Sequence, residues 1–204
     1  MTNGFLDKAF QTRDAASTRS FYDAWSLRYE TDVSQNRYAT PERCAKALAT
    51  YCSDKDAPIL DFGCGTGLSG LALRNAGFRT IDGMDISTDM LEKARAKRLY
   101  RHVHQSVENA ALPHKTETYT SVSAVDVIGA GAAPVFVLHM LMQGLNAGGK
   151  LVFSYNDHSL ENPQNEAALN EWLDCGAARL LFKEYGPHLP GINLNANVYV
   201  IEKT

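Results

Sequence analysis

Cysteine is scarce in this sequence, and its placement gives no metal-binding or disulfide pattern. The four cysteines among 204 residues include no CxxC pair and have no histidine at the spacing of a metal-ligand set. We therefore expect neither a zinc or other metal site nor a framework of disulfide bonds. A chain without structural disulfides is typical of the reducing cytoplasm, which is its expected location. The cysteines are Cys44, Cys52, Cys64 and Cys175.

An excess of positive charge and a long apolar run are also missing. Twenty Lys and Arg residues stand against 23 Asp and Glu residues, a formal net charge of −3. Since phosphate contacts need clustered Lys and Arg, we expect no nucleic-acid partner and no polybasic contact with a membrane. No segment approaches the ~20 apolar residues that span a bilayer. Residues 1–10 lack the layout of a secretory signal, so we expect no membrane association.

The length suits one domain with a short extension, because 204 residues can bury a substantial core. Residues 1–38 are polar and are predicted to form an N-terminal helical extension, and residues 39–204 to form the main domain. Tyr22, Trp25 and Tyr29 are spaced at i, i+3 and i+7, which predicts that they share one face of a helix. We expect that face to pack on the main domain.

Short apolar runs alternate with helical segments along the main domain. This alternation predicts an α/β fold, a Rossmann-like doubly wound and mostly parallel seven-stranded sheet with helices on both faces. The last two strands are too close in sequence for a helical crossover, so we expect them to form an antiparallel pair. The predicted strands are 58–62, 79–85, 101–105, 121–128, 150–155, 179–185 and 196–202, and the predicted helices are 40–52 with Thr40 as N-cap, 66–76, 87–98, 134–145 and 165–175.

The glycine-rich loop after the first strand is the most informative segment. Gly63, Gly65 and Gly67 follow the strand, and glycines there allow a sharp turn and a close approach of a ligand to the main chain. Two ligands fit this pattern. A dinucleotide fits G-x-G-x-x-G over residues 65–70, and S-adenosylmethionine fits G-x-G-x-G over residues 63–67. A tight turn that binds nothing is the remaining interpretation.

The acidic residue at the start of the loop decides between these ligands. A carboxylate at Asp61 would repel a pyrophosphate, whereas it could stabilise a sulfonium and an ammonium group directly or through water. Asp85, at the end of the second strand, could accept hydrogen bonds from both hydroxyls of a ribose. We therefore favour S-adenosylmethionine as the cofactor.

The sequence resembles the class I S-adenosylmethionine-dependent methyltransferases. Residues 60–67, 83–87 and 145–151 look like sequence blocks of that family. Residues 22–25 and 186–188 are similar to the small Williams–Beuren-region-like methyltransferases. The resemblance implies a seven-stranded sheet with an antiparallel last strand, S-adenosylmethionine as cofactor, and methyl transfer.

The resemblance also implies roles for individual residues. The glycine loop would line the methionine and ribose end of the cofactor, and Ile86 and Met90 would flank the adenine. Glu108, or Val107 if the register shifts by one residue, would meet the adenine amino group. Residues 1–38 would act as a lid that covers the methionine half. The expected cofactor-binding residues are Tyr22, Tyr29, Asp61, Gly63, Cys64, Gly65, Gly67, Asp85, Ile86, Met90, Val107 and Glu108.

The acceptor side is less defined, and its candidates follow the fourth and fifth strands. Asp126 could face the sulfonium or an acceptor amine, and His158 could orient or deprotonate an acceptor. A solvated strand end and an exposed loop are the alternatives for these two residues. His102 and His104 have strand spacing, and without a third ligand they indicate a solvated face.

We expect an enzyme that methylates a small molecule, as a monomer or homodimer. No Asn-Pro-Pro-Tyr-like sequence follows the fourth strand, and the family uses that sequence for nucleobase and amide nitrogens. Two other functions stay open at this point: an NAD-dependent Rossmann oxidoreductase, and a non-catalytic module that binds S-adenosylmethionine.

Overall fold

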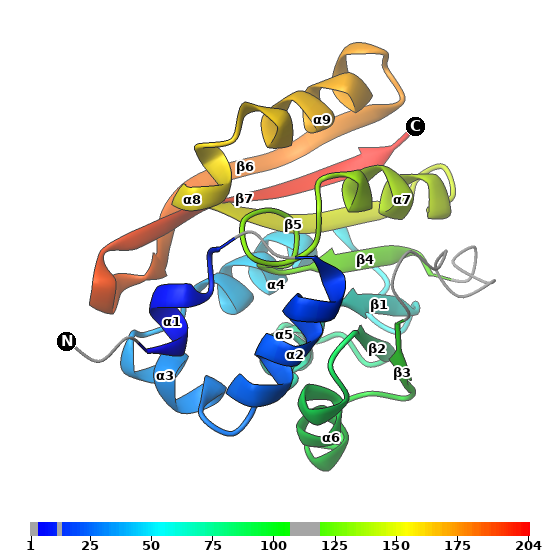
Figure 1. The fold of residues 1–204 in the computed structure, drawn as a ribbon. Coiled ribbons are helices and arrows are strands. Elements are labelled where there is room, and N and C mark those ends of the chain that lie inside the picture. Colours follow the sequence, from blue (N-terminus) through cyan, green and yellow to red (C-terminus); the bar gives the residue numbers. More distant parts are fainter. Residues whose placement is uncertain (1–3, 12–13, 107–118) are drawn as a thin grey trace.

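Seven strands form one sheet at the centre of the computed structural model, which describes residues 4–11, 14–106 and 119–204. The strand order is β3-β2-β1-β4-β5-β7-β6, and the pairs from β3 to β5 are parallel, whereas β7 is antiparallel to both of its neighbours (Figure 1). The predicted α/β sheet with an antiparallel last strand is confirmed. The strands are β1 (Ile59–Phe62), β2 (Ile81–Asp85), β3 (Val103–Gln105), β4 (Ser121–Ala124), β5 (Lys150–Asn156), β6 (Ala178–Leu189) and β7 (Leu194–Lys203).

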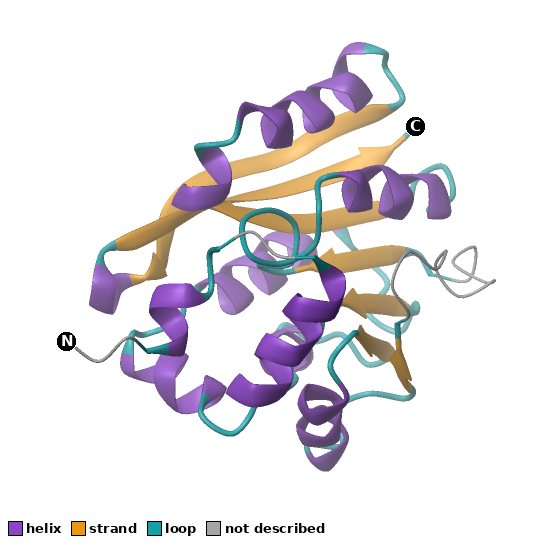
Figure 2. Cartoon of the chain, in the orientation of Figure 1, coloured by secondary structure: helices purple, strands orange, loops and turns teal. Residues whose placement is uncertain are grey.

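Helices cover both faces of this sheet (Figure 2). Leu48 of α4 and Leu73 of α5 belong to one buried cluster with strand side chains, and Leu138 of α7 and Leu169 of α9 belong to another. The two clusters are the two halves of a doubly wound core. The helices are α1 (Phe5–Lys8), α2 (Ala15–Trp25), α3 (Tyr29–Gln35), α4 (Thr40–Tyr51), α5 (Leu68–Asn75), α6 (Thr88–Ala96), α7 (Phe136–Gly144), α8 (Asp157–Leu160), α9 (Pro163–Asp174) and the 3₁₀ turn η2 (Pro190–Ile192).

Local sequence explains where several helices begin. The Ser87 hydroxyl accepts a hydrogen bond from the Met90 backbone N–H at 3.1 Å and so caps α6, as predicted. Asn156 caps α8 by accepting from the Ser159 N–H at 3.0 Å. Because Asn156 also ends β5, this cap turns the chain at the edge where the parallel strands end.

The prediction of one helix through Tyr22, Trp25 and Tyr29 is wrong. Helix α2 ends at Trp25, and α3 begins at Tyr29. The indole of Trp25 donates to the carboxylate of Asp32 on α3 at 2.8 Å, so the two helices are joined by a side-chain contact across the break. The rings still touch, with centroids 6.0 Å apart for Tyr22–Trp25 and 4.8 Å for Trp25–Tyr29.

Two further boundaries differ from the prediction. Ala39, not Thr40, is the N-cap of α4, because the buried Thr40 hydroxyl is engaged with Nδ1 of His188 at 2.7 Å. Strand β4 ends at Ala124 rather than at residue 128. Asp126 has a left-handed backbone with φ +56°, a conformation that cannot continue a strand.

The N-terminal helices lie at the edge of the sheet where β5 ends, shown in blue in Figure 1. Their aromatic side chains form a buried cluster around Trp25, which also includes Leu189 and Leu194 from the ends of β6 and β7. The chain start and the last hairpin therefore meet at the same edge. The division into residues 1–38 and 39–204 stays a prediction.

Candidate functional site

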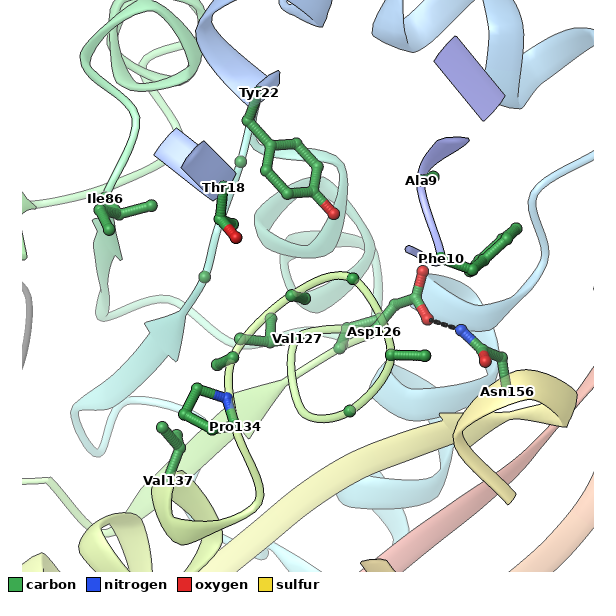
Figure 3. Close-up of a pocket in the computed structure, with 18 of the residues that line it drawn as sticks. Ala9, Phe10, Thr18, Tyr22, Ile86, Asp126, Val127, Pro134, Val137 and Asn156 are labelled. Atoms are coloured by element: carbon green, nitrogen blue, oxygen red, sulfur yellow. Dashed lines mark hydrogen bonds between the residues drawn. The ribbon is translucent and has the colours of Figure 1, made fainter. Parts of the chain in front are cut away.

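A cavity of about 1100 Å³ opens at the edge where the parallel strands end. Single-ligand pockets usually measure about 300–1,000 Å³, so this cavity has room for two small molecules. Its walls come from the segments that follow β1, β2, β4 and β5, and from the N-terminal helices. Figure 3 shows Thr18 and Tyr22 on one side, facing the loop that carries Asp126 and Val127.

The glycine loop forms the wall after β1. Gly63 and Gly65 both line the cavity and have left-handed backbones, with φ of +69° and +52°. The N–H groups of Gly63 and Cys64 donate to the Met84 carbonyl at 2.7 and 2.9 Å, which fixes the loop against β2. A Cβ on Gly65 would meet nothing within 4 Å, so a ligand can approach its main chain closely.

Asp85 ends β2 beside this loop and also lines the cavity. One carboxylate oxygen accepts from the Gly65 N–H and the other from the Ser87 N–H, each at 2.8 Å. Removal from bulk water raises the pKa of Asp85, and these backbone donors partly oppose that shift. A carboxylate has about four acceptor positions, so two remain for a diol. The apolar side chains of Ile86 and Met90 line the cavity as well.

Asp61 lies beneath the loop and does not line the cavity. Its side chain is 0% exposed, and one carboxylate oxygen accepts from the hydroxyls of Ser69 at 2.7 Å and Tyr100 at 2.8 Å. Burial raises the pKa of Asp61 to about 6, and the two hydroxyl donors act against the rise. Its role toward a cofactor stays a prediction. The structure shows a buried carboxyl group that is hydrogen-bonded to Ser69, at the start of α5, and to Tyr100.

Two other residues of the loop, Cys64 and Gly67, lie outside the lining of the cavity. Cys64 is buried with Leu91 and Ala94 of α6. Gly67 is the N-cap of α5, with φ +95°. Neither lines the large cavity. Val107 and Glu108, the candidates for the adenine amino group, lie outside the described residues.

Tyr22 and Tyr29 both line the cavity, so the structure brings the predicted cover residues to the predicted loop. Removal from water raises the pKa of the Tyr29 phenol, and the negative charges of Asp126 and Asp85 add to that rise. Tyr29, Asp85 and Asp126 all line one cavity.

Asp126 is the acidic side chain of the wall after β4. Its Oδ1 accepts from the Asn156 amide at 2.9 Å, and its backbone N–H donates to the Ser154 hydroxyl at 2.9 Å. Both partners belong to β5, so the neighbouring strand fixes Asp126 at the cavity (Figure 3). His158, the other predicted catalytic residue, lines the cavity from α8 with its ring centroid 4.5 Å from that of Phe10.

His188 is a site residue that the sequence analysis did not select. It is 0% exposed, lines the cavity, and has its Nε2 3.5 Å from the second oxygen of Asp126. A register shift between Pro187 and Leu189 places it at a bulge of β6, and bulges re-aim side chains. Residues 186–188 were noted only for their resemblance, and a bulge in a hairpin has no sequence signal that would place His188 here.

The comparisons with known proteins agree with this geometry. A family model described as a methyltransferase domain matches residues 34–189. The chain belongs to the methyltransferase-domain family. Human methyltransferase-like protein 27 is 32% identical to this methyltransferase over 164 residues, which are 79% of this chain and 66% of the human protein. The 18S rRNA (guanine-N(7))-methyltransferase of Bos taurus is 33% identical over 85 residues, 41% of this chain and 30% of that protein.

A solved structure shows the same fold over nearly the whole chain. The magnesium protoporphyrin IX methyltransferase of Synechocystis PCC 6803, with S-adenosylhomocysteine bound, matches 94% of this chain and 100% of that one, with a TM-score of 0.70 and 16% identity. The predicted family, class I S-adenosylmethionine-dependent methyltransferases, is confirmed, and S-adenosylmethionine is the indicated cofactor. The matched part of this methyltransferase spans less than two thirds of its curated relatives' length.

The residues at the β1 and β2 ends fit S-adenosylmethionine. Asp85 has acceptor positions left for the two ribose hydroxyls, and Gly65 leaves open space beside its main chain. Ile86 and Met90 give an apolar surface of the kind that an adenine ring needs. This end of the cavity would therefore bind the nucleoside part of the methyltransferase cofactor.

The described residues contain neither a group of metal ligands nor a membrane-spanning helix. Within residues 4–11, 14–106 and 119–204, no three His, Cys, Asp or Glu side chains are grouped as a metal would require. Over the same residues, no helix is long and apolar enough to cross a membrane. His104 lies on β3 and His102 just before it. Both are exposed, and their ring centroids are 6.0 Å apart.

Proposed function

We propose that this methyltransferase transfers the methyl group of S-adenosylmethionine to a small-molecule acceptor by in-line displacement. The observation that supports this best is the single cavity that joins the Asp85 end to the Asp126 end. A nucleoside at Asp85 leaves the remaining space, beside Asp126, for a second molecule.

The bound cofactor supplies a methyl group on a positively charged sulfur, which is already a good leaving group. The protein then mainly has to align the acceptor with the methyl carbon, and alignment can contribute ~7–11 kcal/mol to the rate. The glycine loop and Asp85 would fix one partner, and the segment after β4 the other. Tyr22 and Tyr29, on helices that cover the cavity, would exclude water, as expected of residues 1–38 acting as a lid.

A small acceptor fits the cavity better than a nucleic acid. One partial relative is named for methylating rRNA, but among the described residues that line this cavity none is Lys or Arg. A phosphate backbone needs such residues. Membership of the methyltransferase family disfavours an NAD-dependent oxidoreductase. A module that binds the cofactor without catalysis would bind S-adenosylmethionine but never release S-adenosylhomocysteine.

Replacing Asp85 tests the cofactor site. We expect Asp85→Ala to weaken S-adenosylmethionine binding by at least about 1–3 kcal/mol, because it removes the acceptor of the ribose hydroxyls, which is at least a factor of about five in Kd. Calorimetry measures this, with Asp174→Asn as a matched control, because Asp174 is exposed at the end of α9. Circular dichroism checks that both variants are folded.

Two results would contradict the proposal. One is an unchanged Kd for S-adenosylmethionine in the folded Asp85→Ala variant, and the other is tighter binding of NADH than of S-adenosylmethionine to the natural protein. A metabolite panel that releases no S-adenosylhomocysteine, despite tight cofactor binding, would favour the non-catalytic module.

A further inference from the structure

The charged side chains that line the cavity are all of one sign. Among the described residues of its walls, four are carboxylates and none is Lys or Arg. Asp85 is assigned to the ribose, and Asp126 lies at the acceptor end. An acceptor that carries a carboxylate or phosphate would find no Lys or Arg among the described lining residues, where only the histidines His104, His158 and His188 can take up a positive charge. The four are Asp14, Asp85, Asp126 and Glu161.

Asp126 is the most firmly positioned of these carboxylates. Its side chain is 23% exposed, and Asn156 and Ser154 fix its side chain and backbone. The amide of Asn156 is itself oriented, because its oxygen caps α8. A carboxylate that the fold holds in this way is preorganised, so binding a charge beside it requires little rearrangement.

His188 packs against Asp126 at the same place. Its Nδ1 is paired with the Thr40 hydroxyl, and its fully buried Nε2 lies 3.5 Å from the second oxygen of Asp126. His188 therefore helps to hold the carboxylate in position, and the partly exposed carboxylate of Asp126 is within reach of a polar group of the acceptor.

One wall of the acceptor end is apolar. Phe10, Val127, Pro134, Val137 and Met140 line the cavity, together with the polar side chains of Asn162, Gln164 and Asn165. Figure 3 shows Val127 on the loop that carries Asp126, and Phe10 on the opposite side of Asp126. Small side chains of the loop after β4 widen the space between these walls: Ala130, Ala132 and Ala133. The apolar wall therefore favours an acceptor with an apolar face, and Asp126 favours a polar end.

We propose that the acceptor is an apolar amine, methylated on a nitrogen that lies beside Asp126. This inference rests on the proposed methyl transfer. An amine that arrives as an ammonium ion first loses one proton to water. The lone pair of the neutral amine then forms the new N–C bond as the bond between the methyl carbon and sulfur breaks, and the electron pair of that bond stays on sulfur. The product is an N-methylammonium ion, whose positive charge lies beside Asp126.

Electrostatics favours an amine over an alcohol at this site. During transfer to an amine the positive charge moves from sulfur to nitrogen, and a carboxylate beside the nitrogen stabilises the charge where it develops. An ammonium ion loses its proton far more readily than an alcohol does, so an alcohol depends more on a base to become comparably nucleophilic. Asp126 therefore binds the amine and stabilises its methylated product.

Matched ligands test the proposal. On each of three scaffolds, phenyl, naphthyl and straight-chain octyl, an amine, the corresponding alcohol and the corresponding carboxylate are titrated into protein saturated with S-adenosylhomocysteine. We expect the amine to bind at least tenfold more tightly than the alcohol on at least one scaffold, and the carboxylate most weakly. With S-adenosylmethionine, mass spectrometry should find one added methyl group on the nitrogen of the amine that binds.

Asp126→Asn tests the residue. Asn tolerates the left-handed backbone of position 126 and has nearly the same shape, so the fold is kept. We expect the preference for the amine over the alcohol to fall below threefold in this variant and to persist in Asp174→Asn. The order of affinities of the amine, the alcohol and the carboxylate is measured on the natural protein. It therefore tests the amine proposal even if Asp126→Asn does not fold.

The outcomes separate the two proposals. If the natural protein binds S-adenosylhomocysteine but prefers the amine on no scaffold, whether affinities are equal or no ligand binds, the amine proposal is overturned alone. A preference for the carboxylate, or an amine preference that survives in folded Asp126→Asn, also overturns it. If S-adenosylhomocysteine itself does not bind, the proposed function fails.

Discussion

At the scale of single residues, Asp61 and Asp85 show how position gives two carboxyl groups different tasks. Asp85 faces the cavity and is held by backbone N–H groups, whereas Asp61 is wholly buried and is held by the hydroxyls of Ser69 and Tyr100. Both have raised pKa values because they have lost water. Only Asp85 is placed to contact a ligand.

The burial of Asp61 predicts a pH dependence of stability. Its pKa rises from 3.8 to about 6 on folding, so ionising it costs the folded state on the order of 3 kcal/mol more than the unfolded state. Below about pH 4 the group is protonated in both states and there is no cost. The cost grows between about pH 4 and 6 and stays constant above that range.

Asp61→Asn removes this titration. We expect the stability of the variant relative to the natural protein to rise by up to about 3 kcal/mol between pH 4 and 7. Urea denaturation at several pH values measures it, and the difference between the two proteins cancels groups that titrate in both. A difference that stays constant over this range would show that Asp61 does not have the raised pKa.

At this scale the structure brings several residues of the predicted site together. Asp85, Gly65 and Asp126 all line the cavity, because the carboxyl ends of parallel strands meet at one edge of the sheet. Their roles toward a cofactor or an acceptor stay predictions. Asp61 was placed in the binding site because sequence position does not tell which face of a strand end is turned to the ligand. His188 was missed because it reaches Asp126 from a strand 62 residues later in the chain.

At the scale of elements, two glycines of the same loop offer a controlled comparison. Gly63 and Gly65 have similar left-handed backbones, but a Cβ on Gly63 would lie 2.3 Å from a methyl carbon of Val127, and a Cβ on Gly65 would meet nothing. Alanine in this conformation costs ~1–2 kcal/mol at either position. We expect Gly63→Ala to destabilise the protein by clearly more than Gly65→Ala.

A third substitution distinguishes the cost of the left-handed backbone from the steric clash with Val127. In the Gly63→Ala background, Val127→Ala removes the methyl groups that collide, so we expect it to recover part of the lost stability. The same Val127→Ala change alone should destabilise the protein, because it only removes apolar contacts. Thermal or urea unfolding of the four proteins gives this cycle. Equal losses for Gly63→Ala and Gly65→Ala would refute the collision.

The errors in predicting elements have different causes. Thr40 is a good capping residue by type, but its hydroxyl is engaged in a tertiary contact with His188. The spacing of Tyr22, Trp25 and Tyr29 suits a helix, yet α2 ends at Trp25 and α3 begins at Tyr29. Alternating apolar runs and turns, in contrast, are local signals, and they predicted every strand of the sheet.

At the scale of the whole molecule, the N-terminal helices complete the cavity that the sheet begins. Trp25 lines the cavity from α2, and the other tryptophan, Trp172, packs on α9 against His139 of α7. In Trp172→Phe, Trp25 is the single tryptophan. We expect its fluorescence emission to change as S-adenosylmethionine binds, with a midpoint equal to the calorimetric Kd.

The reverse variant is the control for this measurement. Trp25→Phe keeps only Trp172, whose emission should stay constant during the same titration. An equal change in both variants would show that the signal does not come from the cover, and the lid proposed for residues 1–38 would lose its support.

The residues assigned to the methyl donor and those assigned to the acceptor come from two consecutive segments of the chain. The groups assigned to the methyl donor, Gly65 and Asp85, precede β4, and the polar groups assigned to the acceptor, Asp126, Asn156 and His188, follow its start. The two lengths meet along the β1–β4 pairing, with the N-terminal helices bordering both. A genetic crossover just before β4 would therefore exchange what is methylated and keep the donor, so that new specificities can arise by recombination between relatives.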